Sequence, residues 1–479
     1  MLLPDPSPLR IDRTPQLERL DRQALEGSII KVPARPWTMV VGDGLVSELV
    51  TNLFNFDGTY LFPALDKDAF IEDMRSGDVK RSTYCTPLLV NAICAVQSNF
   101  SQSAKRFGAI AKKNLPDRFL EETKGLLERE QGRASIPNAI ALVFMYMAVA
   151  ISGKDRIYRT HLYTAYGLLG RLSLEQRFQA LVSRLDSQKL RRIISHVLWG
   201  LYIVESRTAF YYSQTFFIPT PRLPKPPDEP GTANVDVLGR LYDESDGTVP
   251  LVPGVNTVNC HLTELWNELM QYICQGAAKG SDADLRVRKS FYCKLMAMHE
   301  TEIIFTILRD VPLDTPCQNL FDLPGTTARD IIRKRCVTDI ELLRSYMDRW
   351  QHLGSLACRH THLCIHTLVP LLDDPAVHVA FSAACMIAQQ CTLNMKVMGY
   401  LLQAVQAFAW AFGKTIPESA RPFLRGWGAE AMEPDLPLSL VLPQQSDVVD
   451  ALARDWGVHL DDGEDQLRLL IELWARQGQ

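Results

Sequence analysis

DSQKLRRIISHVLWGLYIVESRTAFYYSQTFFIPTPRLPKPPDEP (residues 186–230) is the stretch from which the organisation of this chain is best understood. Its first half repeats apolar residues at helical spacing, at Leu190, Ile193, Ile194, Val197, Leu198, Leu201 and Val204. Its second half contains six prolines, which exclude a regular helix or a central strand because proline lacks a backbone N–H. The stretch therefore predicts a buried amphipathic helix that runs into an extended, proline-stiffened aromatic arm on the surface.

The composition is that of an ordinary globular protein. The chain has 479 residues, of which 47% are hydrophobic and 22% are charged. This length allows a substantial core and suggests two or three domains. The formal net charge of -4 argues against a protein that binds nucleic acid through its whole surface, because such proteins are normally basic.

Neither a secretory signal nor a membrane span is expected. The first residues, MLLPDPSPLRIDRTPQ, lack a positively charged lead followed by an apolar core. The longest apolar run, residues 140–151, is too short to cross a bilayer, which needs about 20 residues. The eleven cysteines include no Cys-x-x-Cys pair and are expected to be reduced, mostly buried thiols. These features predict an intracellular protein.

Helical periodicity dominates both sides of the opening stretch. On the N-terminal side, helices are predicted at 45–54, around Phe70 and Met74, and at 87–101, 116–129, 135–152, 157–170 and 174–185. On the C-terminal side they are predicted at 257–276, 284–309, 326–368, 374–391, 395–413 and 463–477. No alternating pattern is long enough to form a sheet. The predicted class is all-α, a multi-helix array with long proline-rich surface loops.

Local signals place some helix starts and the domain boundaries. Asp66 or Asp68 is expected to cap the helix that carries Phe70, and Thr86 and Pro87 are expected to open the next one. The predicted organisation is a linker or N-terminal arm, a helical domain of two halves, and a proline-rich stretch with a C-terminal amphipathic helix. These parts cover residues 1–35, 36–415 (halves about 36–230 and 256–415) and 416–479.

Five segments resemble, in order, the fungal-specific transcription factor domain, the middle homology region of fungal zinc-cluster regulators. They are FNFDGTYLFPALDKDAFIEDMRSG (54–77), PLLVNAICAVQSNFS (87–101), FLEETKGLLERE (119–130), ASIPNAIALVFM (134–145) and the helix and arm at 190–230. The resemblance covers about residues 36–230. It implies a helical regulatory region that restrains the output of an activator and takes part in ligand response or partner contacts.

The chain also departs from that family. The family's N-terminal zinc cluster holds two zinc ions with six cysteines in a basic stretch and places a helix in the major groove. Here the first cysteine is Cys85, inside the helical region, and residues 210–214 replace a Leu-Gly-Arg-Pro-like stretch. Either the chain never had this module or the sequence lost it. Direct DNA binding by this chain is not supported.

One group of residues raises the question of a metal site. Cys358, His362 and His366 are spaced four apart and share a helix face, with His360 and Cys364 beside them. Zinc accepts both ligand types, but the sequence identifies no fourth ligand. The alternative is a helix with buried cysteines and hydrogen-bonded histidines, and no metal is predicted.

The sequence gives little support for an enzyme. Residues 461–465, DDGED, match the pattern by which all-α terpene synthases hold magnesium, but no second metal-binding motif is found. Acidic residues at the start of the last helix are also favoured by the helix dipole. His299-Glu300 lacks the second histidine of a zinc protease, and Gly42-Asp43-Gly44 is interpreted as a turn. No catalytic residue and no cofactor are therefore predicted.

Two further features have two interpretations each. The basic residues Arg329, Arg333, Lys334 and Arg335 could contact phosphate or an importin, or could form a solvated helix face. The final helix combines acidic residues with leucines and Trp474, which suits an activation segment. Docking of this helix on the body of the domain explains the pattern equally well.

We therefore expect a nuclear transcription regulator that acts through protein partners, either the transcription machinery or another regulator. A small-molecule effector and a homodimer are compatible with it, and secondary metabolism is one process it could serve. The alternatives are a DNA-binding activator whose zinc cluster lies outside this sequence, and a helical enzyme. The candidate regulatory or partner surface consists of Trp199, Tyr202, Tyr211, Tyr212, Leu223 and Pro224.

Overall fold

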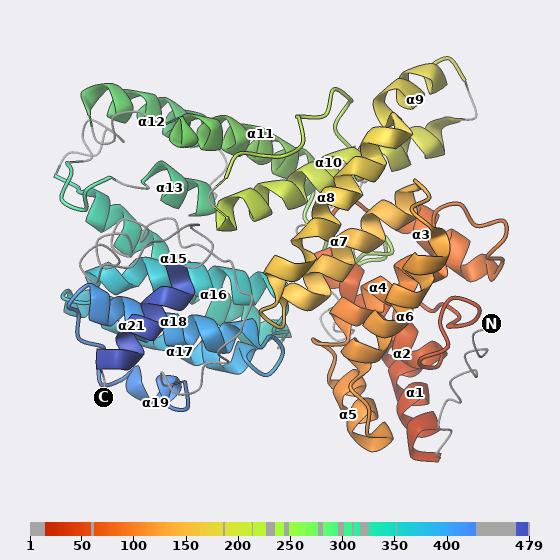
Figure 1. The fold of residues 1–479 in the computed structure, drawn as a ribbon, viewed down its shortest axis with the longest axis horizontal. Coiled ribbons are helices and arrows are strands. Elements are labelled where there is room, and N and C mark those ends of the chain that lie inside the picture. Colours follow the sequence, from red (N-terminus) through yellow and green to blue (C-terminus); the bar gives the residue numbers. More distant parts are fainter. Residues whose placement is uncertain are drawn as a thin grey trace. The chain divides into compact units, whose positions relative to one another are not determined.

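The computed structural model describes most of the chain, and its regular elements are helices (Figure 1). The described residues are 15–58, 62–184, 187–212, 214–226, 235–243, 249–275, 281–295, 301–308, 311–316, 325–350, 352–427 and 466–477. Within these ranges there is no β-strand, and β-pairing is limited to the isolated bridges Val235–Leu241 and Pro316–Thr327. The predicted all-α class is confirmed.

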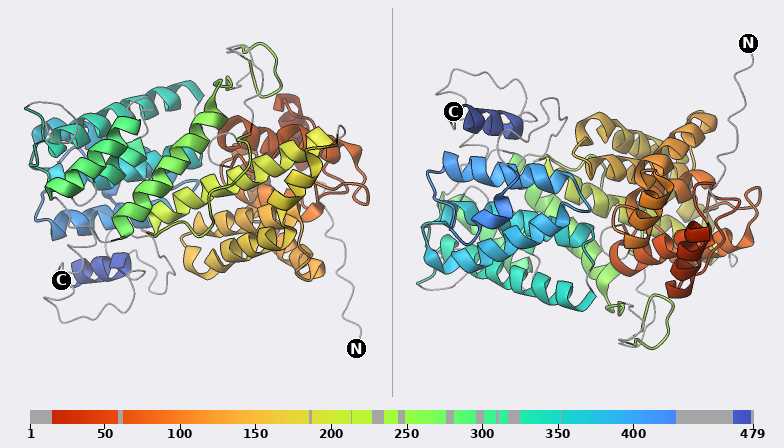
Figure 2. Two further views of the ribbon diagram at one scale, coloured as in Figure 1. Left: turned by 90° about the horizontal axis from the view of Figure 1, so that it is seen from above. Right: turned by 90° about the horizontal axis from the view of Figure 1, so that it is seen from below.

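The helices before residue 212 follow the predicted segments closely. They are α1 (Pro15–Gly27), α2 (Asp43–Asn52), the π-helix η1 (Leu53–Asp57), α3 (Lys67–Ser76), α4 (Pro87–Gln97), α5 (Gln102–Ala111), α6 (Leu115–Glu130), α7 (Ile136–Ala150), α8 (Asp155–Leu172), α9 (Leu174–Leu181) and α10 (Gln188–Tyr211). Figure 2 shows α10 as one continuous helix in yellow-green. Helix α5 was not expected; Ser101 caps it by accepting a hydrogen bond from the Ala104 amide.

The second set of helices begins at residue 255. They are α11 (Val255–Cys274), α12 (Asp282–Leu295), α13 (Thr301–Ile307), α15 (Ala328–Trp350), α16 (Ser355–Leu368), the short 3-10 turns η4 (Val369–Leu371) and η5 (Pro375–Val377), α17 (His378–Cys391), α18 (Val397–Ala411), α19 (Arg421–Leu424) and α21 (Gln466–Gln477). The prediction of a single helix at 326–368 is wrong. The structure has two helices there, α15 and α16, and Gly354 precedes α16 in an extended conformation.

The chain divides into two compact units. Unit 1 comprises residues 1–150, 157–201 and 221–256, and unit 2 comprises residues 151–156, 202–220 and 257–479. The division falls inside α10, after Leu201, whereas the sequence suggested two halves separated by a loop near residue 230. Each unit therefore takes part of α10 into its own core.

Unit 1 is organised around α4. Every residue of α4 from Leu88 to Gln97 is buried, and α4 contacts α2, α6 and α7. The predicted start is confirmed: the Thr86 side chain accepts a hydrogen bond from the Leu89 amide, and Pro87 occupies the first turn, where its missing N–H costs nothing. The predicted cap of α3 is Asp66, which accepts a hydrogen bond from the Ala69 amide.

The first described residues pack into unit 1, which differs from the linker or arm expected for residues 1–35. Leu17 on α1 is buried, and α1 contacts α2. The Asp21 carboxylate accepts hydrogen bonds from the amides of Gly44 and Leu45, at 3.1 and 2.8 Å. These amides belong to the first turn of α2, so residues 42–44 form a helix start rather than the turn that we expected.

Unit 2 is a layered stack of helices in which α16 contacts α15, α17 and α18. All but two residues of α16 are buried, since neighbours cover it on several sides. Helix α21 packs on α18 and buries Leu467, Leu470, Ile471 and Leu473. Among the helices of the described ranges, none has the length and apolar composition needed to cross a membrane.

A buried carboxyl group lies beside α4 in unit 1. Asp57, the last residue of the π-helix η1, is fully buried and accepts a hydrogen bond of 2.8 Å from Gln97 Nε2. Its second oxygen, Oδ1, and the Gln97 Oε1 have no hydrogen-bond partner among the described residues. Burial raises the pKa of Asp57 from 3.8 to about 6, because the charged form loses its hydration.

We predict that Asp57→Asn stabilises the protein at neutral pH. A pKa that is higher in the folded state than in the unfolded state stabilises the fold below about pH 4, and this contribution is lost as the pH rises through about 6. Above pH 6, burial of the charged Asp57 carboxylate lowers the free energy of unfolding by about 3 kcal/mol. The amide side chain in Asp57→Asn carries no charge, which removes this cost, and it can donate a hydrogen bond to Gln97 Oε1. Urea denaturation at pH 4 and pH 7 measures the difference, with Glu26→Gln as an exposed control. A variant no more stable than the wild type at pH 7 would contradict the prediction.

Gly200 permits a close approach of two backbone segments in unit 1. A Cβ atom built on Gly200 would lie 2.2 Å from the Ala64 nitrogen and 2.3 Å from its Cα. Both contacts are to backbone, which cannot move away as the end of a side chain can.

We predict that Gly200→Ala lowers the free energy of unfolding by about 2–3 kcal/mol, because overpacking forces the backbone apart. The matched control is Gly167→Ala on α8, where an added Cβ meets nothing within 4 Å. This control should be neutral or stabilising by up to about 1 kcal/mol. Chemical denaturation of both variants tests the prediction, and equal effects would refute it.

Candidate regulatory site

The six residues of the predicted regulatory surface lie on α10 or on the segment that follows it. They fall into two groups. Trp199, Leu223 and Pro224 belong to unit 1, and Tyr202, Tyr211 and Tyr212 belong to unit 2. Each group is described within its own unit.

In unit 1 the arm, residues 221–226, is fixed along the first half of α10. Trp199 Nε1 donates a hydrogen bond of 3.2 Å to the Leu223 carbonyl, and Ser195 Oγ donates one of 3.1 Å to the Pro224 carbonyl. The Lys225 ammonium lies 5.0 Å from the centre of the Trp199 ring. Because proline-rich backbone cannot satisfy its own carbonyls in a helix, α10 supplies the donors.

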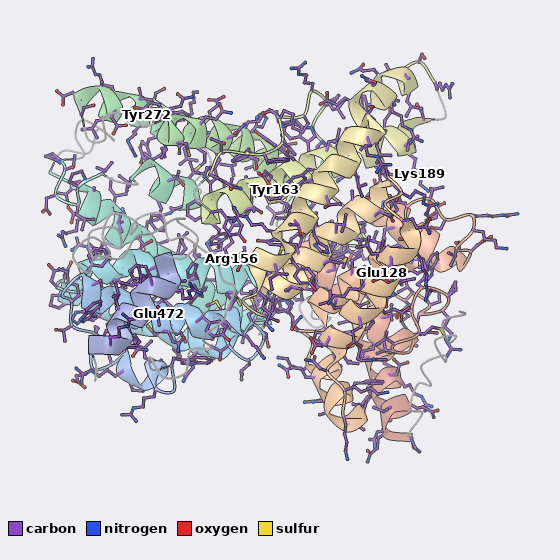
Figure 3. The ribbon with its side chains drawn as sticks, viewed as in Figure 1. Glu128, Arg156, Tyr163, Lys189, Tyr272 and Glu472 are labelled. Carbon is purple, nitrogen blue, oxygen red and sulfur yellow. The ribbon has the colours of Figure 1, made fainter. Side chains whose placement is uncertain are left out.

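The basic start of α10 has a structural role. The Arg192 guanidinium makes a two-pronged ion pair with the Asp66 carboxylate, with Nη2 3.1 Å from Oδ1. Lys189, labelled in Figure 3, pairs with Glu72 at 2.6 Å. Asp66 and Glu72 belong to the cap and body of α3, so the basic residues hold α10 against α3.

In unit 2, Tyr202 and Tyr212 are anchored by their hydroxyl groups. The Tyr202 hydroxyl lies 2.9 Å from Thr220 Oγ1, and burial raises the pKa of Tyr202 to about 12. The Tyr212 hydroxyl donates a hydrogen bond of 2.7 Å to the buried Asp155 carboxylate. The Glu205 carboxylate accepts one of 2.7 Å from the Phe217 amide, which holds the segment after α10 to the helix.

Most of the six residues are therefore interior. Tyr212 and Leu223 are 8% and 6% exposed, and Trp199 and Tyr202 are also buried. Pro224 is exposed and Tyr211 is half-buried. An interior polar group needs a hydrogen-bond partner. The Tyr212 hydroxyl and the Leu223 carbonyl each have one, so both residues can be buried. The regulatory role of the six residues stays a prediction.

The structure adds a group that the sequence did not identify, which we call the cation–aromatic cluster. It consists of Arg207 and Tyr211 on α10, Trp266 on α11, and Arg359 and His362 on α16, all in unit 2. Arg207 lies among apolar residues of a core helix. A charged residue in such a place can be recognised in the sequence as a candidate. Its partners could not be predicted because they lie far along the chain.

The histidines and cysteines of α16 do not form a metal site. Within the described residues, no group of three or more His, Cys, Asp or Glu side chains is placed to hold a metal ion. The His362 and His366 rings meet edge to face at 4.6 Å, whereas His360 and Cys364 face Asp339. Burial lowers the pKa of His362 to about 3, so this ring is neutral at physiological pH.

The other candidate residues are paired or lie outside the described ranges. Arg329, Arg333 and Arg335 each lie within 4.0 Å of aspartate carboxylates, and Lys334 is exposed. Such pairing favours a solvated helix face over a phosphate site. The acidic motif at 461–465 and the pair at 299–300 fall outside the described residues.

Comparison with known proteins gives two relatives. The chain is 31% identical over 269 residues to the notoamide biosynthesis transcriptional activator notL' of Aspergillus versicolor, which covers 53% of this chain and 40% of that protein. It is 27% identical over 205 residues to the nitrogen assimilation transcription factor nit-4 of Neurospora crassa, covering 40% and 17%. Both relatives are fungal transcription factors. The chain thus spans less than half the length of either.

Two other comparisons found nothing. No family model matches the chain. No solved structure matches it either. The similarity to the two transcription factors is therefore the finding on which a functional proposal depends.

We predict that Trp199→Phe loosens the arm. The change leaves the buried Leu223 carbonyl without the indole donor, which costs about 1–3 kcal/mol. Trypsin should then cut after the exposed Arg222 about tenfold faster, because cleavage follows local opening. Trp350→Phe, at the end of α15, is the control. An unchanged cleavage rate in Trp199→Phe would show that the indole does not hold the arm.

Proposed function

We propose that this chain is the helical regulatory region of a nuclear transcription regulator of the fungal zinc-cluster type. In this proposal the chain acts through protein partners, either the transcription machinery or another regulator. A small-molecule effector tunes its output. The observation that carries the proposal is the similarity to two named transcription factors over 269 and 205 residues.

The architecture supports a regulatory rather than a catalytic role. The described residues form two helical units whose candidate residues are mainly buried and hydrogen-bonded. Burial lowers the pKa of His362 and raises the thiol pKa of Cys85, Cys94 and Cys385 far above its usual value, so these interior groups are uncharged at neutral pH. A helical scaffold of this kind suits binding and conformational control.

The alternative is a complete DNA-binding activator with a zinc cluster that lies outside this sequence. The two forms differ in what this chain does alone. Because the chain has a net charge of -4 and its densest basic cluster is paired with aspartates, it should form no specific complex with DNA. A specific complex in a gel-shift experiment at physiological salt would favour the alternative.

The structure bears on the two interpretations of the last helix. An activation segment must present its apolar residues to a partner, but α21 buries four of them against the core that includes α18. We therefore assign α21 to the body of unit 2.

The proposal predicts that the chain alters transcription when it is brought to a promoter. The full chain, fused to an unrelated DNA-binding domain in a fungal host, should raise or lower reporter output relative to that domain alone. Gly200→Ala should weaken this effect because it disrupts unit 1, whereas Gly167→Ala should leave it intact. Reporter output equal to that of the DNA-binding domain alone, from a fusion detected in the nucleus, would overturn the proposal.

A further inference from the structure

Helix α5 of unit 1 carries positive charge without interspersed acids. Between Thr86 and Pro116 the charged residues are all basic: Lys105, Arg106, Lys112 and Lys113. Arg106, Lys112 and Lys113 are exposed, and their side chains form no ion pair with another residue of the described ranges. Figure 1 shows α5 at one end of unit 1 beside α1, and the two helices are in contact. A chain with a net charge of -4 therefore presents a locally positive surface here.

The neighbouring helix α6 has the charge pattern of a face that meets only water. Acidic and basic residues are interspersed along it, and Arg118 pairs with Glu121 at 2.8 Å, one turn away. This mixture is usual for a solvated helix face, because each charge finds an opposite one nearby. Helix α5 lacks such a mixture. A negatively charged partner would lower the energy of its surface.

Two acids lie at the ends of α5, each with an uncharged partner. Glu48 accepts a hydrogen bond from Ser101 Oγ at the N-terminus, and Asp117 accepts one of 2.6 Å from Asn114 Nδ2 beyond the C-terminus. The helix dipole favours an acid at the N-terminus and a cation at the C-terminus. It does not favour Arg106, which lies in the middle of α5, so helix stability alone does not account for this cation.

The backbone after α5 holds the last two cations in fixed positions. The amides of Lys112 and Lys113 donate hydrogen bonds of 3.3 and 2.9 Å to the carbonyls of Ala109 and Gly108. A Cβ atom built on Gly108 would lie 2.7 Å from the Lys113 carbonyl oxygen, so this backbone packs tightly on the helix. A surface that is already ordered loses little conformational entropy when it binds a partner.

An apolar side chain lies among these cations. Ile110 is 40% exposed and is four residues after Arg106, so the two share a face of α5. Lys112 and Lys113 follow it by two and three residues. We call Arg106, Ile110, Lys112 and Lys113 the α5 basic surface. It combines three unpaired cations with one exposed apolar group.

We infer that the α5 basic surface binds an acidic peptide segment that also carries apolar side chains. The carboxylates of such a segment match the exposed cations, and an apolar side chain of the segment covers Ile110. A short segment senses mainly the nearby charges, because salt screens interactions beyond about 8 Å at physiological ionic strength. A nucleic acid would extend over the rest of a chain whose net charge is -4, and its phosphates gain nothing from Ile110.

This inference rests on the proposed function only in naming the source of the acidic segment, which is the transcription machinery or another regulator. Binding is measured on the isolated chain, and regulation is measured with the reporter. A peptide that binds while the reporter output stays unchanged would overturn the proposed function alone. A working reporter without peptide binding would overturn the α5 site alone.

The experiment measures the binding of a fluorescein-labelled amphipathic peptide of glutamate and leucine to the full chain, by fluorescence anisotropy at physiological salt. One comparison peptide replaces every glutamate by glutamine, and another replaces every leucine by serine. A labelled single-stranded DNA of similar length tests for nucleic-acid binding. The glutamate–leucine peptide should bind in a saturable manner. The glutamine peptide should bind about tenfold more weakly, and the serine peptide about fivefold more weakly.

Variants test the role of the surface residues. Arg106→Glu and Lys113→Glu should each weaken binding of the glutamate–leucine peptide about tenfold, because each replaces an attraction by a repulsion. Ile110→Ser keeps every charge and should weaken binding about fivefold. The matched control is Arg177→Glu, which reverses the charge of an exposed arginine on α9 and should change nothing.

Every substituted side chain is exposed, so the variants should fold, which circular dichroism checks. No saturable binding of the glutamate–leucine peptide, or equal binding of the glutamine peptide, would overturn the inference. Undiminished binding in folded Arg106→Glu, or tighter binding of the DNA than of the peptide, would also overturn it.

Discussion

The carboxylate of Asp66 is the interaction on which the described part of unit 1 most depends. It caps α3 through the Ala69 amide and receives the two-pronged ion pair from Arg192 on α10. The Asp66 amide donates a hydrogen bond of 2.8 Å to the Tyr84 hydroxyl, which itself donates to the Ala64 carbonyl. Ala64 is also the residue that Gly200 approaches. One acidic side chain therefore links the start of α3 to the first half of α10.

Unit 2 holds buried arginines in two kinds of surroundings. In unit 2, Arg288 is buried with Asp284 on the same helix, and its Nε lies 2.9 and 2.8 Å from the two carboxylate oxygens. Tyr272, labelled in Figure 3, donates a hydrogen bond of 2.9 Å to the same carboxylate. This charge is neutralised locally and has a structural role. Arg207 and Arg359 also lie over the aromatic ring of Trp266, whose face attracts cations.

Much of the fold could be predicted from periodicity and helix-start signals, but the site could not. Thr86 and Pro87 marked α4, and Asp66 marked α3, because capping chemistry is local in sequence. Helix α5 was missed because its cap, Ser101, was assigned to the end of the preceding helix at 87–101, and the break before α16 was missed because a single glycine, Gly354, marks it. The cation–aromatic cluster contains residues up to 155 positions apart (Arg207 to His362), and no local pattern in the sequence reports such a meeting.

The docking of α21 determines how far the chain can be shortened. Helix α21 is separated from α19 in sequence and resembles a tail that can be removed without harm. Yet Leu467, Leu470, Ile471 and Leu473 belong to the buried core of unit 2. A chain ending before Gln466 would uncover the apolar side of α18 and present it to other copies. Shortening the chain there would produce self-association rather than a smaller soluble regulator.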